Sequence, residues 1–70
     1  MTSPFTAICT QRGEWWVGWI EEIPGVNAQE CTKPELLASL KEILLEALAF
    51  NREDARAAAG QNYTEEPLAV

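Results

Sequence analysis

The segment that most constrains this chain is a run of six residues, Trp15–Ile20 (WWVGWI). Aromatic and β-branched residues favour β-strands, and alternate side chains of a strand point to opposite faces of the sheet. Trp15 and Trp19 therefore share one face, and Trp16 lies on the other. Both faces are apolar, whereas a sheet with one face in water would not need tryptophan on each side. We therefore expect this part of the sheet to be apolar on both faces.

The neighbouring segments predict a small antiparallel sheet. Residues 5–10 (FTAICT) alternate in polarity and predict a first strand, and residues 11–14 (QRGE) form a short polar turn with the glycine that a hairpin requires. Pro24 and Gly25 predict a second turn. A shorter third strand is expected over residues 26–31 (VNAQEC).

A helix start follows the third strand. Thr32 is placed as the N-cap, Glu35 stands at the third helical position as in a capping box, and Pro34 lies in the first turn. Apolar residues then recur at helical spacing, at Leu36, Leu37, Leu40, Ile43, Leu44, Ala47 and Leu48. The opposite side is expected to carry Glu35, Ser39, Glu42 and Glu46.

The pattern weakens after Phe50. Residues 51–59 could extend the helix as far as Gly60 or belong to a tail, and residues 67–70 (PLAV) could add an edge strand. The predicted order is β-β-β-α, with an optional final β. This order indicates one α+β domain over residues 1–70, with a core over about residues 3–50 and one helix packed on one face of the sheet.

The charge of the chain excludes several functions. Eleven Asp and Glu residues against five Lys and Arg give a net charge of −6, and residues 1–20 are neutral as a group. Binding of a nucleic-acid backbone needs clustered cations, so we expect no direct contact with DNA. The chain has no histidine, the commonest general base and metal ligand. We therefore predict no enzyme activity and no cofactor or metal.

The two cysteines, Cys9 and Cys31, are too few for a zinc site. They could form a disulfide if they lay on neighbouring strands. The first residues lack the features of a signal peptide, and no segment is apolar enough to span a membrane. We therefore expect a soluble cytoplasmic domain with reduced thiols.

Residues 3–50 combine four features in a characteristic order. They are the aromatic strand Trp15–Ile20, a Pro-Gly-Val turn over residues 24–26, Ala28-Gln29 followed by Thr32, and a glutamate that leads into a leucine repeat. Together these features resemble the HicB-like antitoxin family. The family usually has glycine at the position of Glu30. Many members also continue into a DNA-binding segment, for which this chain is too short, so here it departs from the family and we expect no direct binding to operator DNA.

The resemblance implies a partial RNase H-like fold and the role of an antitoxin. Such antitoxins neutralise a small, basic mRNA interferase of HicA type by covering its active site, and they usually self-associate. The implied partners are therefore a HicA-type toxin and further copies of this chain, in a dimer or tetramer.

The tryptophans are the first candidate interface. Gly18 indicates that the face with Trp16 lies under the closely packed helix, which leaves Trp15 and Trp19 on the outward face. One helix covers one face only, so the outward face is either an interface, an exposed patch, or covered by residues 51–70. We favour an interface, with a toxin or with another copy.

Acidic residues complete the candidate surface. Glu21 and Glu22 close the second strand, and Glu35, Glu42 and Glu46 form a stripe that is either a solvated helix face or a docking charge for a basic partner. The alternative to an antitoxin is an orphan oligomeric scaffold or a small-ligand-binding module without a toxin. A metal-dependent nuclease is a remote third hypothesis, because such a site needs convergent carboxylates and Asp54 is the only aspartate.

Overall fold

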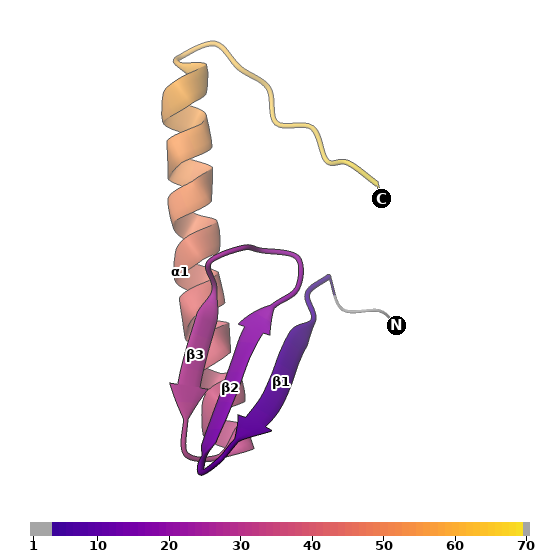
Figure 1. Ribbon diagram of the computed structural model, residues 1–70. Coiled ribbons are helices and arrows are strands. Elements are labelled where there is room, and N and C mark those ends of the chain that lie inside the picture. Colours follow the sequence, from indigo (N-terminus) through magenta and orange to yellow (C-terminus); the bar gives the residue numbers. More distant parts are fainter. Residues whose placement is uncertain (1–3, 70) are drawn as a thin grey trace.

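The computed structural model describes residues 4–69, in which three strands precede one long helix (Figure 1). The elements are β1 Ala7–Arg12, β2 Trp15–Ile20, β3 Asn27–Glu30 and α1 Lys33–Ala59. The strands form one antiparallel sheet in the order β1-β2-β3, and α1 packs on one of its faces. The α+β fold with the order β-β-β-α is confirmed. Residues 67–69 form no strand, and Val70 lies outside the described residues.

The β1–β2 hairpin is tighter than expected. Arg12 pairs with Trp15, so the loop holds only Gly13 and Glu14. Gly13 has φ 63°, a positive value that glycine adopts without strain and that the first loop residue of a type II′ turn requires. A type II′ turn has only two loop residues and needs glycine at the first of them. Residues 11–12 therefore belong to β1 and not to the loop.

The predicted N-cap is confirmed. Thr32 is extended at φ −130° and ψ 158°, and its Oγ1 accepts a hydrogen bond from the Glu35 N–H at 3.3 Å. The Thr32 hydroxyl also donates to Glu35 Oε1 at 2.9 Å. In the usual capping box the glutamate would accept from the backbone N–H of the cap residue, so the carboxylate here has a different partner.

The core lies between α1 and the inner face of the sheet. Its buried side chains are Ile20, Val26, Leu36, Leu40 and Leu44. Gly18 allows the close approach of the helix, because a Cβ there would lie 3.1 Å from Leu36 Cδ2 and 2.8 Å from the Ile8 carbonyl oxygen. The face that carries Trp16, Gly18 and Ile20 is therefore the one beneath the helix, as expected.

Two positions on α1 differ from the predicted helix faces. Leu37 was assigned to the apolar stripe but is 44% exposed, and Ser39 was assigned to the solvated side but is half-buried. The Ser39 hydroxyl donates to Glu30 Oε2 at 2.5 Å. The reason is the position of α1, which packs mainly on β3 and β2 and only touches β1. This offset turns Ser39 toward β3 and leaves Leu37 outside the contact.

The helix continues well beyond the sheet (Figure 1). Residues 49–59 are all exposed, and α1 ends where Gly60, at φ 87°, donates its N–H to the Arg56 carbonyl. Residues 51–59 are therefore a helix extension. The chain then turns back, and Arg56 Nε lies 2.6 Å from Glu65 Oε1. Over the described residues, no helix is long and apolar enough to cross a membrane.

Candidate protein-binding surface

The sheet face opposite α1 is the candidate site, and we call it the outer face. Directly paired residues of an antiparallel sheet point to the same side, so the pairing register defines this face. No described element packs on it. Its residues form three cross-strand rows, which are Ile8–Trp19–Asn27, Thr10–Val17–Gln29 and Arg12–Trp15.

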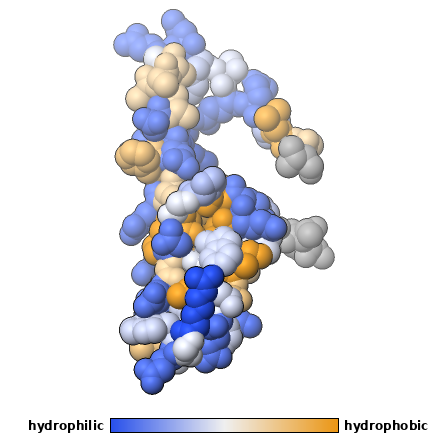
Figure 2. Space-filling view, in the orientation of Figure 1, coloured by the Kyte–Doolittle hydropathy of each residue, from blue (hydrophilic) through white to orange (hydrophobic). Residues whose placement is uncertain are grey.

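The centre of the outer face is apolar. Trp15 is 46% exposed and Trp19 is 40% exposed, and the half-buried Val17 lies between them along β2. Ile8 is directly opposite Trp19 and is also half-buried. Figure 2 shows hydrophobic side chains over the strands, interspersed with side chains of intermediate hydropathy and one strongly hydrophilic side chain, and with hydrophilic side chains at the rim. An apolar centre with tryptophan and a polar rim is the usual anatomy of a protein-binding surface.

Opposite charges stand at the two ends of the outer face. Arg12 lies at the hairpin end, in the row of Trp15. At the other end the ladder continues one step, because the Glu21 N–H donates to the Thr6 carbonyl at 2.9 Å. Glu21 therefore follows Trp19 on the same side. This arrangement can orient a charged partner along the strands.

Glu22 has a structural role instead. Its Oε1 accepts a hydrogen bond from the Thr6 N–H at 2.7 Å, which ties the segment before β1 to the end of β2. This hydrogen bond holds the pKa of the Glu22 carboxyl below its usual value. The carboxylate is therefore already engaged within the chain.

The remaining predicted site residues lie elsewhere. Glu35 caps the start of α1, and Glu42 and Glu46 are exposed on α1, away from the side that the sheet covers. The sheet stands between these helix positions and the tryptophans of the outer face. Trp15, Trp19 and Glu21 are thus brought together, and Glu35, Glu42 and Glu46 are not part of that surface.

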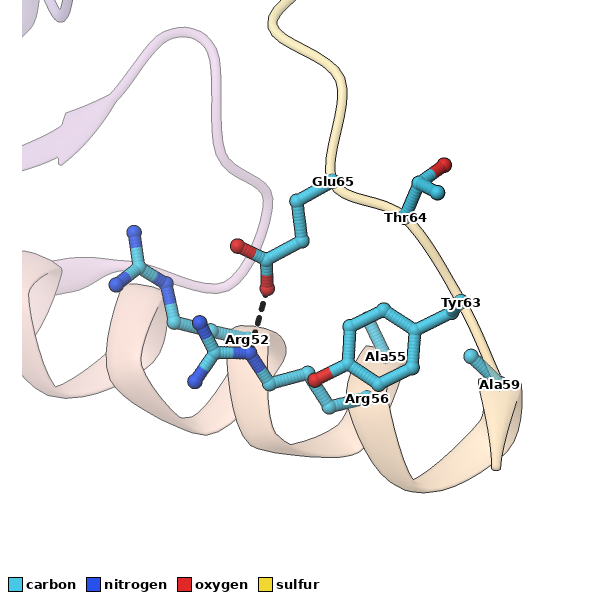
Figure 3. A pocket seen from close by; sticks show the side chains of 7 residues that line it. All are labelled: Arg52, Ala55, Arg56, Ala59, Tyr63, Thr64 and Glu65. Atoms are coloured by element: carbon cyan, nitrogen blue, oxygen red, sulfur yellow. Dashed lines mark hydrogen bonds and ion pairs between the residues drawn. The ribbon is translucent and has the colours of Figure 1, made fainter. Parts of the chain in front are cut away.

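Apart from the outer face, a hollow of about 320 Å³ lies between the end of α1 and the returning tail (Figure 3). Arg52 and Arg56 project into it from the helix, and Tyr63 and Glu65 close it from the tail. The pair with Arg56 holds the pKa of Glu65 below its usual value. The sequence did not predict this hollow, because no local pattern showed that the tail folds back. The only signal was the pair Arg52 and Arg56, one helical turn apart in an acidic chain.

The described residues contain little else that could act chemically. Over residues 4–69, no three Cys, Asp or Glu side chains gather as metal ligands would. Cys9 and Cys31 are both free thiols, and β2 separates the strand of Cys9 from the strand that precedes Cys31. Lys33 Nζ lies 5.9 Å from the centre of the Trp16 ring, close enough for a cation–π contact.

No protein-family model, no curated protein and no solved structure matches the chain.

Proposed function

We propose that this chain is a non-catalytic protein-binding domain that acts as an antitoxin of HicB-like type. Its outer face would dock on a small, basic HicA-type mRNA interferase and cover the active site of that enzyme. The observation that carries the proposal is the pair of exposed tryptophans, Trp15 and Trp19, on a sheet face that no described element covers.

The size of this apolar surface supports a docking role. A tryptophan buries at most about 250 Å², so roughly 100 Å² of each of these two rings is still open to solvent. At about 25 cal/mol per Å², burial of this area would contribute about 2.5 kcal/mol for each ring. Two such anchors are enough to act as hot spots of a specific interface.

The charge of the chain supports a basic partner. The net charge is −6, and Glu21 lies at the end of the outer face itself. Glu42 and Glu46 lie on the other side of the sheet, so they would attract a basic partner at long range without touching it. Such charges raise the rate of association more than the strength of the final contact.

The fold and the thiols agree with the proposal. The sheet β1–β3 and the helix α1 supply the elements that a partial RNase H-like antitoxin domain requires. An antitoxin against an mRNA interferase would act in the cytoplasm, where the free thiols of Cys9 and Cys31 would stay reduced.

Co-expression with a HicA-type interferase tests the proposal. A suitable candidate is a short, basic protein encoded beside this chain. The wild-type chain should co-purify with the toxin and block cleavage of RNA, and the double variant W15S/W19S should lose both properties. Leu45→Ser is the matched control, because Leu45 is an exposed apolar residue on α1. Failure to co-purify with any such basic protein, or equal loss in the Leu45 variant, would contradict the proposal.

A further inference from the structure

The strand β1 is an open edge of the sheet. The order β1-β2-β3 gives β1 a neighbour on one side only, and no described segment pairs with its other side. The hydrogen bond from the Glu21 N–H to the Thr6 carbonyl shows which alternate residues of β1 bond to β2. In an antiparallel pair the bonded positions alternate, so Ile8, Thr10 and Arg12 also bond toward β2. The N–H and C=O groups of Ala7, Cys9 and Gln11 therefore point away from the sheet.

This edge has few of the features that usually protect one, with Arg12 at its end as the single charged side chain. Over its six residues β1 contains no proline, lysine or glycine, and its register with β2 is continuous without a bulge. Ala7 and Gln11 are exposed. The opposite edge is shorter, because β3 has four residues and only Asn27 and Gln29 turn their backbone groups outward.

We propose that two copies of the chain join through this edge, with β1 pairing antiparallel to β1 of the second copy around a two-fold axis at Cys9. In this register Cys9 faces Cys9 of the second copy, and Ala7 faces Gln11. Each of the three outward residues then exchanges its N–H and C=O with the other strand. A shift by two residues would bring Phe5 or Gly13, which lie outside the strand, into the ladder and lose part of this bonding.

The charges near β1 favour a second copy of the chain as the partner that pairs with this edge. Two molecules of charge −6 repel each other, so self-association needs the part of the surface where acidic groups are fewest. Arg12 is the only charged residue of β1. In the proposed register Arg12 faces Thr6 of the second copy, and the next residue in that row is Glu21. Strands are about 4.8 Å apart, so Glu21 is two strands away and within reach of the long arginine side chain.

The packing on the two faces also permits this pairing. On the inner face β1 carries Ala7, Cys9 and Gln11, of which only Gln11 is long. Because α1 is displaced toward β3, the two helices would not collide. On the outer face Ile8 would face Thr10 of the second copy. The two apolar centres would then form one continuous surface with both tryptophan pairs on the same side. This contact between two copies does not require a toxin, so it is separate from the proposed function.

Proline substitutions at the edge test the inference. Gln11→Pro removes an N–H that points away from β2, so the hairpin should keep its ladder while the approach of another strand is blocked. Sedimentation equilibrium should give about twice the 7.8 kDa chain mass for the wild type. For this variant the dissociation constant should rise at least tenfold. Ala7→Pro should behave alike. Gln29→Pro is the matched control, because it makes the same change at the other edge and should leave the dimer intact.

A thiol reporter tests the register. With Cys31→Ser, Cys9 is the only thiol, and oxidation with diamide should produce a covalent dimer, because facing residues of an antiparallel pair lie within disulfide range. The Cys9→Ser variant should give none. A wild-type chain of monomer mass would overturn the inference. A dimer that survives both edge prolines but dissociates in W15S/W19S would also overturn it. If the dimer persists in W15S/W19S while toxin binding is lost, the edge contact and the proposed function are separate.

Discussion

Gly18 and Leu40 are in such close contact that a Cβ on Gly18 would lie 3.2 Å from Leu40 Cδ1. The same Cβ would lie 2.8 Å from the backbone oxygen of Ile8, which has little freedom to move. The helix can rest on the sheet at this point only because β2 has no side chain there. Gly18 thus determines which face of β2 is inside and, as a consequence, which tryptophans are outside.

Gly18→Ala should therefore destabilise the fold. Overpacking of a filled core costs about 1–3 kcal/mol, and urea denaturation followed by circular dichroism would measure the loss. Gly13→Ala is the comparison, because a Cβ there meets nothing within 4 Å and only the positive φ is strained. Its cost should be about 1–2 kcal/mol. A Gly18 variant as stable as the wild type would show that α1 does not rest on β2 at this point.

The three tryptophans should differ in their effect on stability. Trp16 packs against the core, so Trp16→Ser should lower the free energy of unfolding by about 2 kcal/mol, roughly half the cost of deleting a fully buried tryptophan. Trp15→Ser and Trp19→Ser should each change it by less than about 1 kcal/mol, as substitutions outside the core usually do. Denaturation of the three single variants would check this order. The reverse order would place the helix on the other face of the sheet.

Partner binding should depend in different ways on the glutamates of α1, Glu42 and Glu46, and on Glu21 of the outer face. The charge reversals Glu42→Lys and Glu46→Lys should slow association with the proposed basic toxin by about tenfold at low salt, with little change in dissociation. Glu21→Lys should change both rates, because Glu21 adjoins Trp19 on the outer face. Stopped-flow measurements at increasing salt would separate the two effects. An association rate that does not change with salt concentration would show that Glu42 and Glu46 do not attract the partner.

Stability should fall at acidic pH in part through Glu22. Its carboxylate accepts the Thr6 N–H, so its pKa is lower in the folded chain than the ordinary value of 4.5. The stabilisation is therefore present above pH 4.5 and is lost as the pH falls through the folded pKa. Glu22→Gln should lower the melting temperature at pH 7, and the difference from the wild type should shrink by pH 3. Glu53→Gln, at an exposed helix position, is the control. A difference that stays constant with pH would contradict this role of the carboxylate.

Local signals were sufficient for the elements themselves. The alternation of Trp15–Ile20 and the cap at Thr32 act between near neighbours in the chain, so the strands and the start of the helix could be predicted from them. Gly18 even predicted the inner face. The faces of α1 were less predictable, because Leu37 and Ser39 depend on how far the helix is displaced toward β3.

Local sequence patterns were enough to predict the order of the elements, the acidity of the chain and the presence of more tryptophan than one helix can cover. How these features are grouped depends on the packing of α1 against the sheet. The tertiary structure placed Trp15 and Trp19 with Glu21, it moved Glu42 and Glu46 to the other side of the sheet, and it left the edge of β1 open. Periodicity defines a face within one strand or helix, whereas the contact between α1 and the sheet defines how those faces combine.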